Sequence, residues 1–359
     1  MTKMMTEYIV LDNIKSGKLK WDDIVTTSPY AAGMPGSGRM LGSGEKLPLK
    51  SVFQEMSIYS GNDGTVALAE FVASSEENFA KLMNDKAKEL GLTNAHFVTS
   101  TGLSKNDLKG IATINLDGET VMSARDAATL AYRLIKDHPE VLDFTKIPSL
   151  KLRDRDKDAM VNWNWMLEGN KDVTSFKKYA YQGLDGLKTG HTDEAGYCFT
   201  ATAQRNGMRL ISVVMGTKDE PKRFEETRKV LDYGFNNFET KNVLAAGATI
   251  DSLPIVDIKK GKNTTLPVAT ESGVTMVVKK GTTDDQIAKK AVAIDESKRV
   301  APIKKGDKMG TLTLTYNGKD TTVNLIATED AEKASWFRLL FRAIGNFFSD
   351  LFSGIKNLF

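Results

Sequence analysis

The sequence predicts a mixed α/β (α+β) chain in which helices pack on an antiparallel sheet, followed by a small all-β module and an amphipathic C-terminal helix. Three observations lead to this fold class. Apolar residues recur at helical spacing in the first part of the chain, two β-rich runs flank Asn206-Gly207, and short alternating runs fill residues 241–328. The length of 359 residues is enough for about two domains with an appendage.

The first elements predicted are three helices. Residues 65–73 are almost wholly apolar, which is typical of a buried helix. In residues 76–90 the apolar side chains recur every three or four positions, and Gly91 follows where such a helix would end. Ser123 is placed to cap a third helix that runs through residues 124–131.

The next elements predicted are strands. Residues 197–203 and 208–215 are rich in β-forming side chains, and the Asn206-Gly207 pair between them favours a tight hairpin. From residue 241 to 328, short alternating runs are separated by turn signals such as Lys280-Gly281 and Asn317-Gly318. That spacing predicts a separate all-β domain.

The last element predicted is a helix over residues 332–359. Its aromatic and aliphatic side chains recur every three or four positions, with basic and small polar residues between them. This pattern is typical of a helix that lies in a membrane interface without crossing it. Packing on the protein's own core and an oligomer contact are the two alternatives. No run of about 18 apolar residues and no N-terminal signal peptide is present, which taken literally indicates a cytoplasmic chain.

The composition argues against several classes of partner and cofactor. The formal net charge is +3, and no dense stretch of Lys and Arg is interleaved with aromatic residues, so no nucleic-acid partner is expected. A single cysteine, Cys198, excludes an intramolecular disulfide. The three histidines, His96, His138 and His191, are widely separated, so we expect no metal site, and no organic cofactor either.

Three short motifs carry the residue types needed for acyl transfer. Lys3 opens a stretch that can be helical, Ser60-Gly61-Asn62 precedes the first buried helix, and Lys188-Thr189-Gly190 precedes the hairpin. Each motif is common by chance, but the three in this order form a much more specific arrangement. A lysine can take a proton from a hydroxyl group only when it is neutral, and burial beside a second cation lowers a lysine pKa.

These motifs resemble the S-x-x-K, S-x-N and K-T-G motifs of the serine penicillin-recognising enzymes. Residues 60–63 and 186–197 look like those of the D-alanyl-D-alanine carboxypeptidases in that superfamily. The resemblance covers nearly the whole chain. It implies a serine transpeptidase/β-lactamase-like domain over residues 1–238, a β-rich domain over 241–328 and a membrane-anchor helix over 332–359.

The resemblance also implies a role for each site residue. Lys3 would be the general base, Ser60 a proton relay, and Asn62 a ligand of both Lys3 and the substrate amide. The K-T-G strand would orient the terminal carboxylate and pair with the peptide as an added strand. The residues implied for binding the substrate are Lys188, Thr189, Gly190, His191 (through its backbone N–H) and Arg223, with Lys222 as the alternative to Arg223.

Simpler interpretations exist for several of these residues. Lys3 alone would be a surface lysine, and Ser60 and Asn62 would cap the helix that follows them. His191 is less suited to act through its imidazole than through its backbone. Cys198, close to His191, suggests a cysteine hydrolase, but it stands in an apolar run where a buried, inert thiol is expected. The residues His96, Trp163 and Trp165 are expected in the core or the wall of a groove.

One position departs from the family pattern. The nucleophilic serine should stand three residues before Lys3, which falls before Met1, as do the export signal and first strands that the family has. We therefore expect a fragment or a misplaced start codon, or else a shortened relative. The printed chain should not form an acyl-enzyme.

The function expected is that of a serine D-alanyl-D-alanine carboxypeptidase. It would trim the terminal D-Ala from peptidoglycan pentapeptide stems, use no cofactor, and be trapped by β-lactams. Its place would be the extracytoplasmic face of a bacterial membrane, held there through residues 332–359. A class A-like β-lactamase and a catalytically inactive, membrane-tethered scaffold are the alternatives.

Overall fold

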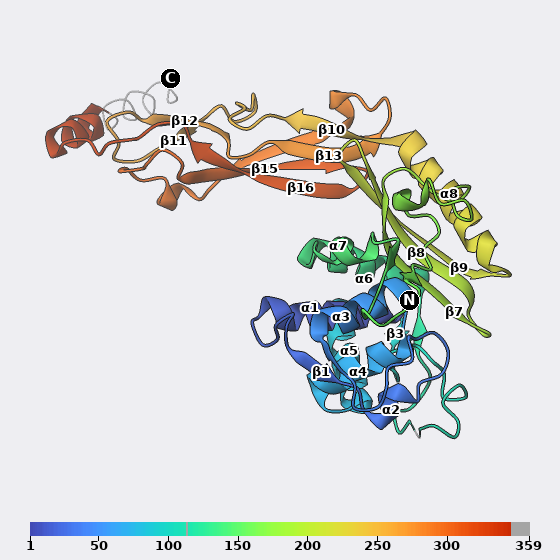
Figure 1. Ribbon diagram of the computed structural model, residues 1–359. Coiled ribbons are helices and arrows are strands. Elements are labelled where there is room, and N and C mark those ends of the chain that lie inside the picture. The colour runs from blue at the N-terminus through green and yellow to red at the C-terminus, as the bar shows by residue number, and fades with distance from the viewer. Residues whose placement is uncertain (113, 346–359) are drawn as a thin grey trace. The chain divides into compact units, whose positions relative to one another are not determined.

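The computed structural model describes residues 1–112 and 114–345, which form two compact units (Figure 1). The first unit is Met1–Asn236, and the second begins at Asn237. Within the described ranges, no helix is long and apolar enough to cross a membrane.

The first unit consists of helices packed on both faces of a three-stranded sheet. Its main helices are α1 (Lys3–Lys15), α3 (Leu49–Gln54), α4 (Asn62–Ala73), α5 (Glu76–Glu89), α6 (Ala124–Asp137), α7 (Val141–Thr145) and α8 (Glu220–Asn237). A short α2 (Pro29–Ala32), a π-helical turn (Glu55–Tyr59) and a 3-10 turn (Glu168–Asn170) complete the helical elements described in this unit. The helices predicted over 65–73, 76–90 and 124–131 are confirmed as parts of α4, α5 and α6.

The sheet is antiparallel in the order β7-β8-β9. Its strands are β7 (Leu184–Thr192), β8 (Gly196–Arg205) and β9 (Met208–Thr217). The hairpin predicted between β8 and β9 is confirmed: Asn206 and Gly207 both have positive φ angles, 49° and 77°, as a two-residue turn of this kind requires. Three two-stranded pairs complete the unit: β1 (Ile24–Thr26) with β2 (Lys46–Pro48), β3 (Ala95–His96) with β4 (Val121–Met122), and β5 (Ser149–Leu150) with β6 (Met160–Val161).

Helices cover the two faces of the sheet with different side chains. On one face, Ile211 and Val213 of β9 join the core to which α1 and α6 contribute. On the other face, Phe199 of β8 meets Phe224 of α8, with ring centroids 5.4 Å apart. The first nine residues of α1 are all buried, so it is a core helix rather than an amphipathic surface helix. This burial places Lys3, at its N-terminal end, inside the protein.

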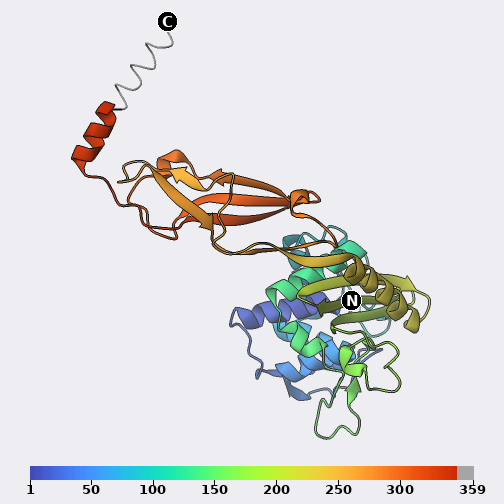
Figure 2. The same ribbon diagram turned by 90° about the horizontal axis from the view of Figure 1, so that it is seen from above.

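The second unit is a β domain with its own hydrophobic core. A five-stranded sheet has the order β11-β12-β16-β15-β14, and β10 pairs with β13. The strands are β10 (Phe238–Leu244), β11 (Ile255–Asp257), β12 (Thr265–Thr270), β13 (Val274–Lys279), β14 (Ala288–Ala293), β15 (Lys308–Tyr316) and β16 (Lys319–Ala327), with 3-10 turns at Asp284–Gln286 and Glu296–Lys298. Strands β15 and β16 form a hairpin and lie side by side in both views (Figures 1 and 2). The all-β character predicted for this region is confirmed.

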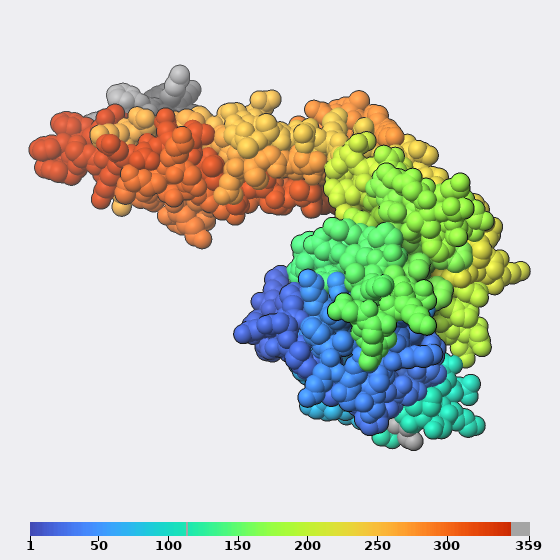
Figure 3. All heavy atoms as spheres, viewed as in Figure 1, coloured from blue at the N-terminus to red at the C-terminus, as the bar shows by residue number. Residues whose placement is uncertain are grey.

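Residues 336–345 form a helix at one end of the second unit (Figure 3), and its large apolar side chains are exposed. The exposed fractions range from 44% for Ile344 to 70% for Phe341. Arg342 ties this helix to the unit by donating to the carbonyl oxygens of Gly261 and Lys262, each at 3.1 Å. The described part of the helix therefore does not bury its apolar face in the core. The rest of the predicted helix, residues 346–359, lies outside the described residues.

Candidate active site

A pocket of about 700 Å³ opens in the first unit where the three sequence motifs meet. The start of α1, the turn before α4 and strand β7 each contribute one motif to its wall. All eight residues predicted for the site line it: Lys3, Ser60, Asn62, Lys188, Thr189, Gly190, His191 and Arg223. The fold thus brings together residues that are far apart in the sequence.

Lys3 is a buried lysine, not the surface lysine of the simpler interpretation. Its Nζ atom donates to Asn62 Oδ1 at 2.6 Å and to the carbonyl oxygen of Thr101 at 3.3 Å. Burial lowers the pKa of Lys3 to about 8, against the opposing effect of Glu55 and Asp63, whose negative charges raise it. A large share of Lys3 is therefore neutral in weakly alkaline solution, as a general base must be.

Lys188 is the second buried lysine of the pocket. It is 2% exposed on β7, and burial followed by the charge of Lys3 lowers the pKa of Lys188 to about 7. Two buried ammonium groups are disfavoured together, so one of the two lysines gives up its proton readily.

Within the segment Ser60-Gly61-Asn62, Asn62 holds Lys3, and neither Ser60 nor Asn62 caps α4. The N-cap position is Gly61, and no side chain caps this helix end, so the capping interpretation of Ser60 and Asn62 is wrong. Ser60 has a left-handed backbone with φ of 62° and lines the pocket. Asn62 is fixed on three sides: Oδ1 accepts from Lys3, Nδ2 donates to Pro35 O at 2.6 Å, and its backbone N–H donates to Ser37 O at 2.6 Å.

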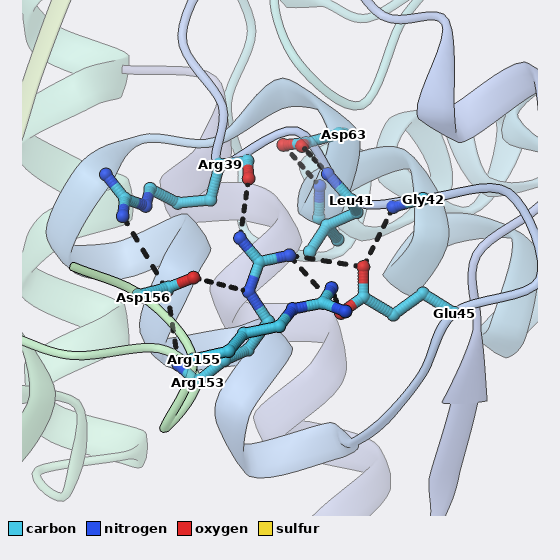
Figure 4. A network of polar contacts seen from close by, with 9 residues as sticks. Arg39, Leu41, Gly42, Glu45, Asp63, Arg153, Arg155 and Asp156 are labelled. Carbon is cyan, nitrogen blue, oxygen red and sulfur yellow. Dashed lines mark hydrogen bonds and ion pairs between the residues drawn. The ribbon is translucent and has the colours of Figure 1, made fainter. Parts of the chain in front are cut away.

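A network of ion pairs and hydrogen bonds holds the loop over residues 34–45 (Figure 4). This loop supplies the carbonyl oxygens of Pro35 and Ser37 to which Asn62 donates. Arg153 donates through Nε to Asp156 at 2.8 Å, through Nη1 to Glu45 at 3.2 Å, and through Nη2 to the carbonyl oxygen of Arg39 at 2.9 Å. The carboxylate of Asp63 accepts from the backbone N–H of Leu41 at 2.9 Å. These bonds hold the loop at Arg39, Leu41 and Glu45, and Asn62 binds it at Pro35 and Ser37.

Strand β7 presents the K-T-G motif along one wall of the pocket. It pairs with β8 on one side, and within the described ranges no strand pairs with its other edge. Gly190 is a close-approach position, because a Cβ atom there would come 2.6 Å from the backbone nitrogen of Met1. The ring of His191 packs on Tyr197, with centroids 4.1 Å apart. An open strand edge of this kind can accept an extended peptide.

Arg223 reaches the pocket from α8, whereas Lys222 does not. Arg223 is 3% exposed, forms an ion pair with Glu220, and donates from Nη1 to the carbonyl oxygen of Gly190 at 3.4 Å. Burial lowers the pKa of the Arg223 guanidinium. Lys222 is absent from the pocket wall and pairs with Glu225 and Glu226 on the exposed side of the helix. Arg223 is therefore the better candidate for binding an anion.

The sequence analysis did not identify Thr101 as a site residue, and it gave only a general location for Trp163, Trp165 and Cys198. The carbonyl oxygen of Thr101 binds Lys3, although no motif marks it. Trp163 lines the pocket and donates its indole N–H to the carbonyl oxygen of Tyr59 at 2.8 Å, so it is a wall residue as expected. Trp165 instead packs on Phe176, with centroids 5.4 Å apart. Cys198 is buried at 6% exposure.

Two buried acids beside the lysines were also missed. Glu7 lies one turn after Lys3 on α1, and burial raises its pKa to about 7. Glu55 is fully buried, and burial raises its pKa well above the usual range. A Cβ atom at Gly61 or Gly64 would overlap the Glu55 carboxyl group. The sequence signal that could have identified Glu7 and Glu55 is an acidic residue within an otherwise apolar helical stretch.

Among the described residues, no group of three or more His, Cys, Asp and Glu side chains is arranged to hold a metal ion. His96 lies outside the pocket and bonds through Nε2 to the carbonyl oxygen of Asp117 at 2.8 Å.

Comparison with known proteins agrees with this geometry. A family model described as D-alanyl-D-alanine carboxypeptidase matches residues 1–219, and one described as the C-terminal domain of penicillin-binding protein 5 matches residues 238–333. The chain belongs to the D-alanyl-D-alanine carboxypeptidase family. The resemblance seen in the motifs is confirmed, as is the fold: a penicillin-binding serine peptidase domain followed by a β-rich domain.

Individual members of this carboxypeptidase family match over most of the chain. It is 35% identical to D-alanyl-D-alanine carboxypeptidase DacF of Bacillus subtilis, over 96% of this chain and 82% of that protein. The crystal structure of penicillin-binding protein 5 from Haemophilus influenzae is 30% identical with a TM-score of 0.70, covering 92% of this chain and 89% of the other. Penicillin-binding protein D2 of Listeria monocytogenes, solved in its ampicillin-bound form, is 32% identical with a TM-score of 0.51, covering 65% and 85%.

Proposed function

We propose that this site removes the terminal D-Ala from peptidoglycan pentapeptide stems by acyl transfer to a serine three residues before Lys3. The observation that carries the proposal is the buried amine of Lys3, hydrogen-bonded to Asn62 in the same pocket as Lys188. A serine at that spacing would lie one helical turn from Lys3, within reach of its amine. That position falls before Met1 and so outside the printed sequence.

The reaction follows from the placement of these groups. The neutral Lys3 amine takes the proton of the serine hydroxyl, whose oxygen attacks the carbonyl carbon between the two D-Ala residues. As the C–N bond breaks, Ser60 relays a proton to the leaving amine of the terminal D-Ala. Water then cleaves the ester and frees the serine. A β-lactam would acylate the same serine, but its ester would be released slowly.

Binding of the substrate is assigned to the other wall of the pocket. The stem peptide would lie along the open edge of β7, with its terminal carboxylate near Lys188, Thr189 and Arg223. The backbone N–H of His191 would donate to the developing oxyanion. Gly190 leaves the strand close to the start of α1, and Asn62 would hold the substrate amide.

The rest of the chain would place this site at the outer face of the bacterial membrane. We assign catalysis to residues 1–238, a supporting role to the β domain of residues 241–328, and peripheral membrane attachment to residues 332–359. The exposed apolar side chains of the helix 336–345 support the last assignment.

A fluorescent penicillin tests the proposed function. We would extend the chain so that a serine directly precedes Met1, with an otherwise identical alanine version as the matched control. Stable labelling of the serine version alone supports the carboxypeptidase. Rapid turnover of the label would indicate a class A-like β-lactamase, and no labelling would indicate an inactive scaffold. Residues 1–359 alone are expected to remain unlabelled, because they hold no residue at that position.

A further inference from the structure

The buried guanidinium of Arg223 already has a carboxylate partner within the chain. Glu220 and Arg223 form an ion pair, while the arginine is 3% exposed and also donates to the carbonyl oxygen of Gly190. A guanidinium taken out of water is strongly destabilising unless an anion accompanies it. Glu220 supplies that negative charge.

Glu220 itself stands in the pocket. It is the first residue of α8, three positions before Arg223, so the two side chains lie on the same face of the helix. The N-terminal end of a helix favours an anionic side chain. Its side chain is 27% exposed and lines the same pocket as Gly190 and Arg223. A negative charge is therefore present where an anionic ligand would approach.

A ligand carboxylate that reaches Arg223 thus meets a guanidinium that is already engaged and a like charge beside it. A guanidinium forms its strongest contacts with a single carboxylate held bidentately. We propose that Glu220 is an internal competitor for Arg223, which weakens the binding of every carboxylate-terminated ligand. Such ligands then depend on additional contacts with β7 to bind. This inference rests on the proposed function, in which Arg223 receives the substrate carboxylate.

The substitution Glu220→Gln tests the competition, because it removes the charge and keeps the size and one acceptor oxygen. The ligands are N-acetyl-D-Ala-D-Ala and its C-terminal amide, titrated calorimetrically against residues 1–359. We expect E220Q to lower the Kd of the acid about fivefold and to leave that of the amide unchanged. Glu225→Gln is the matched control, since it makes the same charge change on α8 at a residue paired with Lys222 outside the pocket.

A second variant asks whether the effect passes through Arg223. In an Arg223→Met background the gain from E220Q should disappear, because the cation for which Glu220 and the ligand compete is absent. The inference is overturned if E220Q weakens binding of the acid, which would mean that Glu220 only positions Arg223. It is also overturned if the amide gains equally, or if the gain persists in the Arg223→Met background.

Failure of the proposed function would look different. A wild-type chain that binds N-acetyl-D-Ala and N-acetyl-L-Ala equally well would contradict a D-Ala-specific site. The gain from E220Q would remain for both compounds in that case, since it depends only on their carboxylate.

Discussion

Lys188 combines a buried ammonium group with one weak hydrogen bond, from Nζ to the carbonyl oxygen of Thr189 at 3.3 Å. Burial and the charge of Lys3 lower its pKa from 10.5 to about 7. Between these two pH values the unfolded chain binds more protons than the folded one. The free energy of unfolding therefore increases as the pH rises from about 7 to about 10, and the cost of the buried charge is largest below pH 7.

Replacement of this lysine by an apolar residue should remove that cost. We predict that Lys188→Met raises the free energy of unfolding at pH 6 by about 1–4 kcal/mol, because a buried charge gives way to a side chain that needs no solvation. The rise in stability between pH 7 and 10 should flatten as well. Urea unfolding at pH 6, 8 and 10 measures both effects. Lys222→Met is the control, since Lys222 is exposed and its pKa is raised by Glu225 and Glu226. An unchanged pH slope in K188M would contradict the assignment.

Site residues differed in how far the sequence could predict them. Lys3, Asn62 and Lys188 belong to motifs whose residue types have a chemical reason, so their meeting in one pocket was expected. Thr101 acts through its backbone oxygen, which carries no sequence signal. Glu220 did offer a signal, an acid three residues before Arg223 on one helix, but its importance depends on both side chains reaching the pocket.

At the scale of elements, the sequence predicted the helices and strands that carry a local sequence signal. The helix α5 was predicted from apolar residues at helical spacing, α4 from an almost wholly apolar run, α6 from its cap at Ser123, and the hairpin β8–β9 from two β-rich runs around Asn206-Gly207; the structure has them all. The loop over residues 34–45 has no regular pattern of apolar residues. Its conformation depends on Arg153, more than 100 positions further along the chain, and such a partner is set by the fold rather than by local sequence.

This dependence makes a testable prediction. Arg153→Ala removes the bonds to Glu45, Asp156 and the carbonyl oxygen of Arg39. The buried carboxylate of Asp156 thereby loses a positively charged partner. We predict a loss of about 2 kcal/mol in the free energy of unfolding and faster hydrogen exchange in residues 34–45.

Arg155→Ala is the matched control for this substitution. Arg155 is 69% exposed and contacts Glu45 alone within the network, so its loss should change stability by less than about 0.5 kcal/mol. Equal effects of the two substitutions on loop exchange would show that the network does not hold the loop.

The whole molecule joins a peptidase unit, with a pocket where the three motifs meet, to a β unit that carries an exposed apolar helix. Among the described residues, none of the helices has the length and hydrophobicity that a bilayer-spanning helix needs. The sequence predicted this helix from its amphipathic period. Its attachment remains a prediction, because exposed apolar side chains at a chain end serve a membrane surface and a partner protein equally well.

Flotation with anionic liposomes separates these two outcomes. The substitutions Phe337→Ser and Phe341→Ser remove two side chains that are 58% and 70% exposed, and together they should weaken liposome binding at least about tenfold. Val277→Ser and Val292→Ser form the matched control, because both valines are 51% exposed apolar residues on strands of the same unit. Their loss should leave flotation unchanged. A chain ending at residue 331 should not float. If it floats as well as the full chain, membrane attachment lies elsewhere, and the helix is then better explained as a contact with another protein.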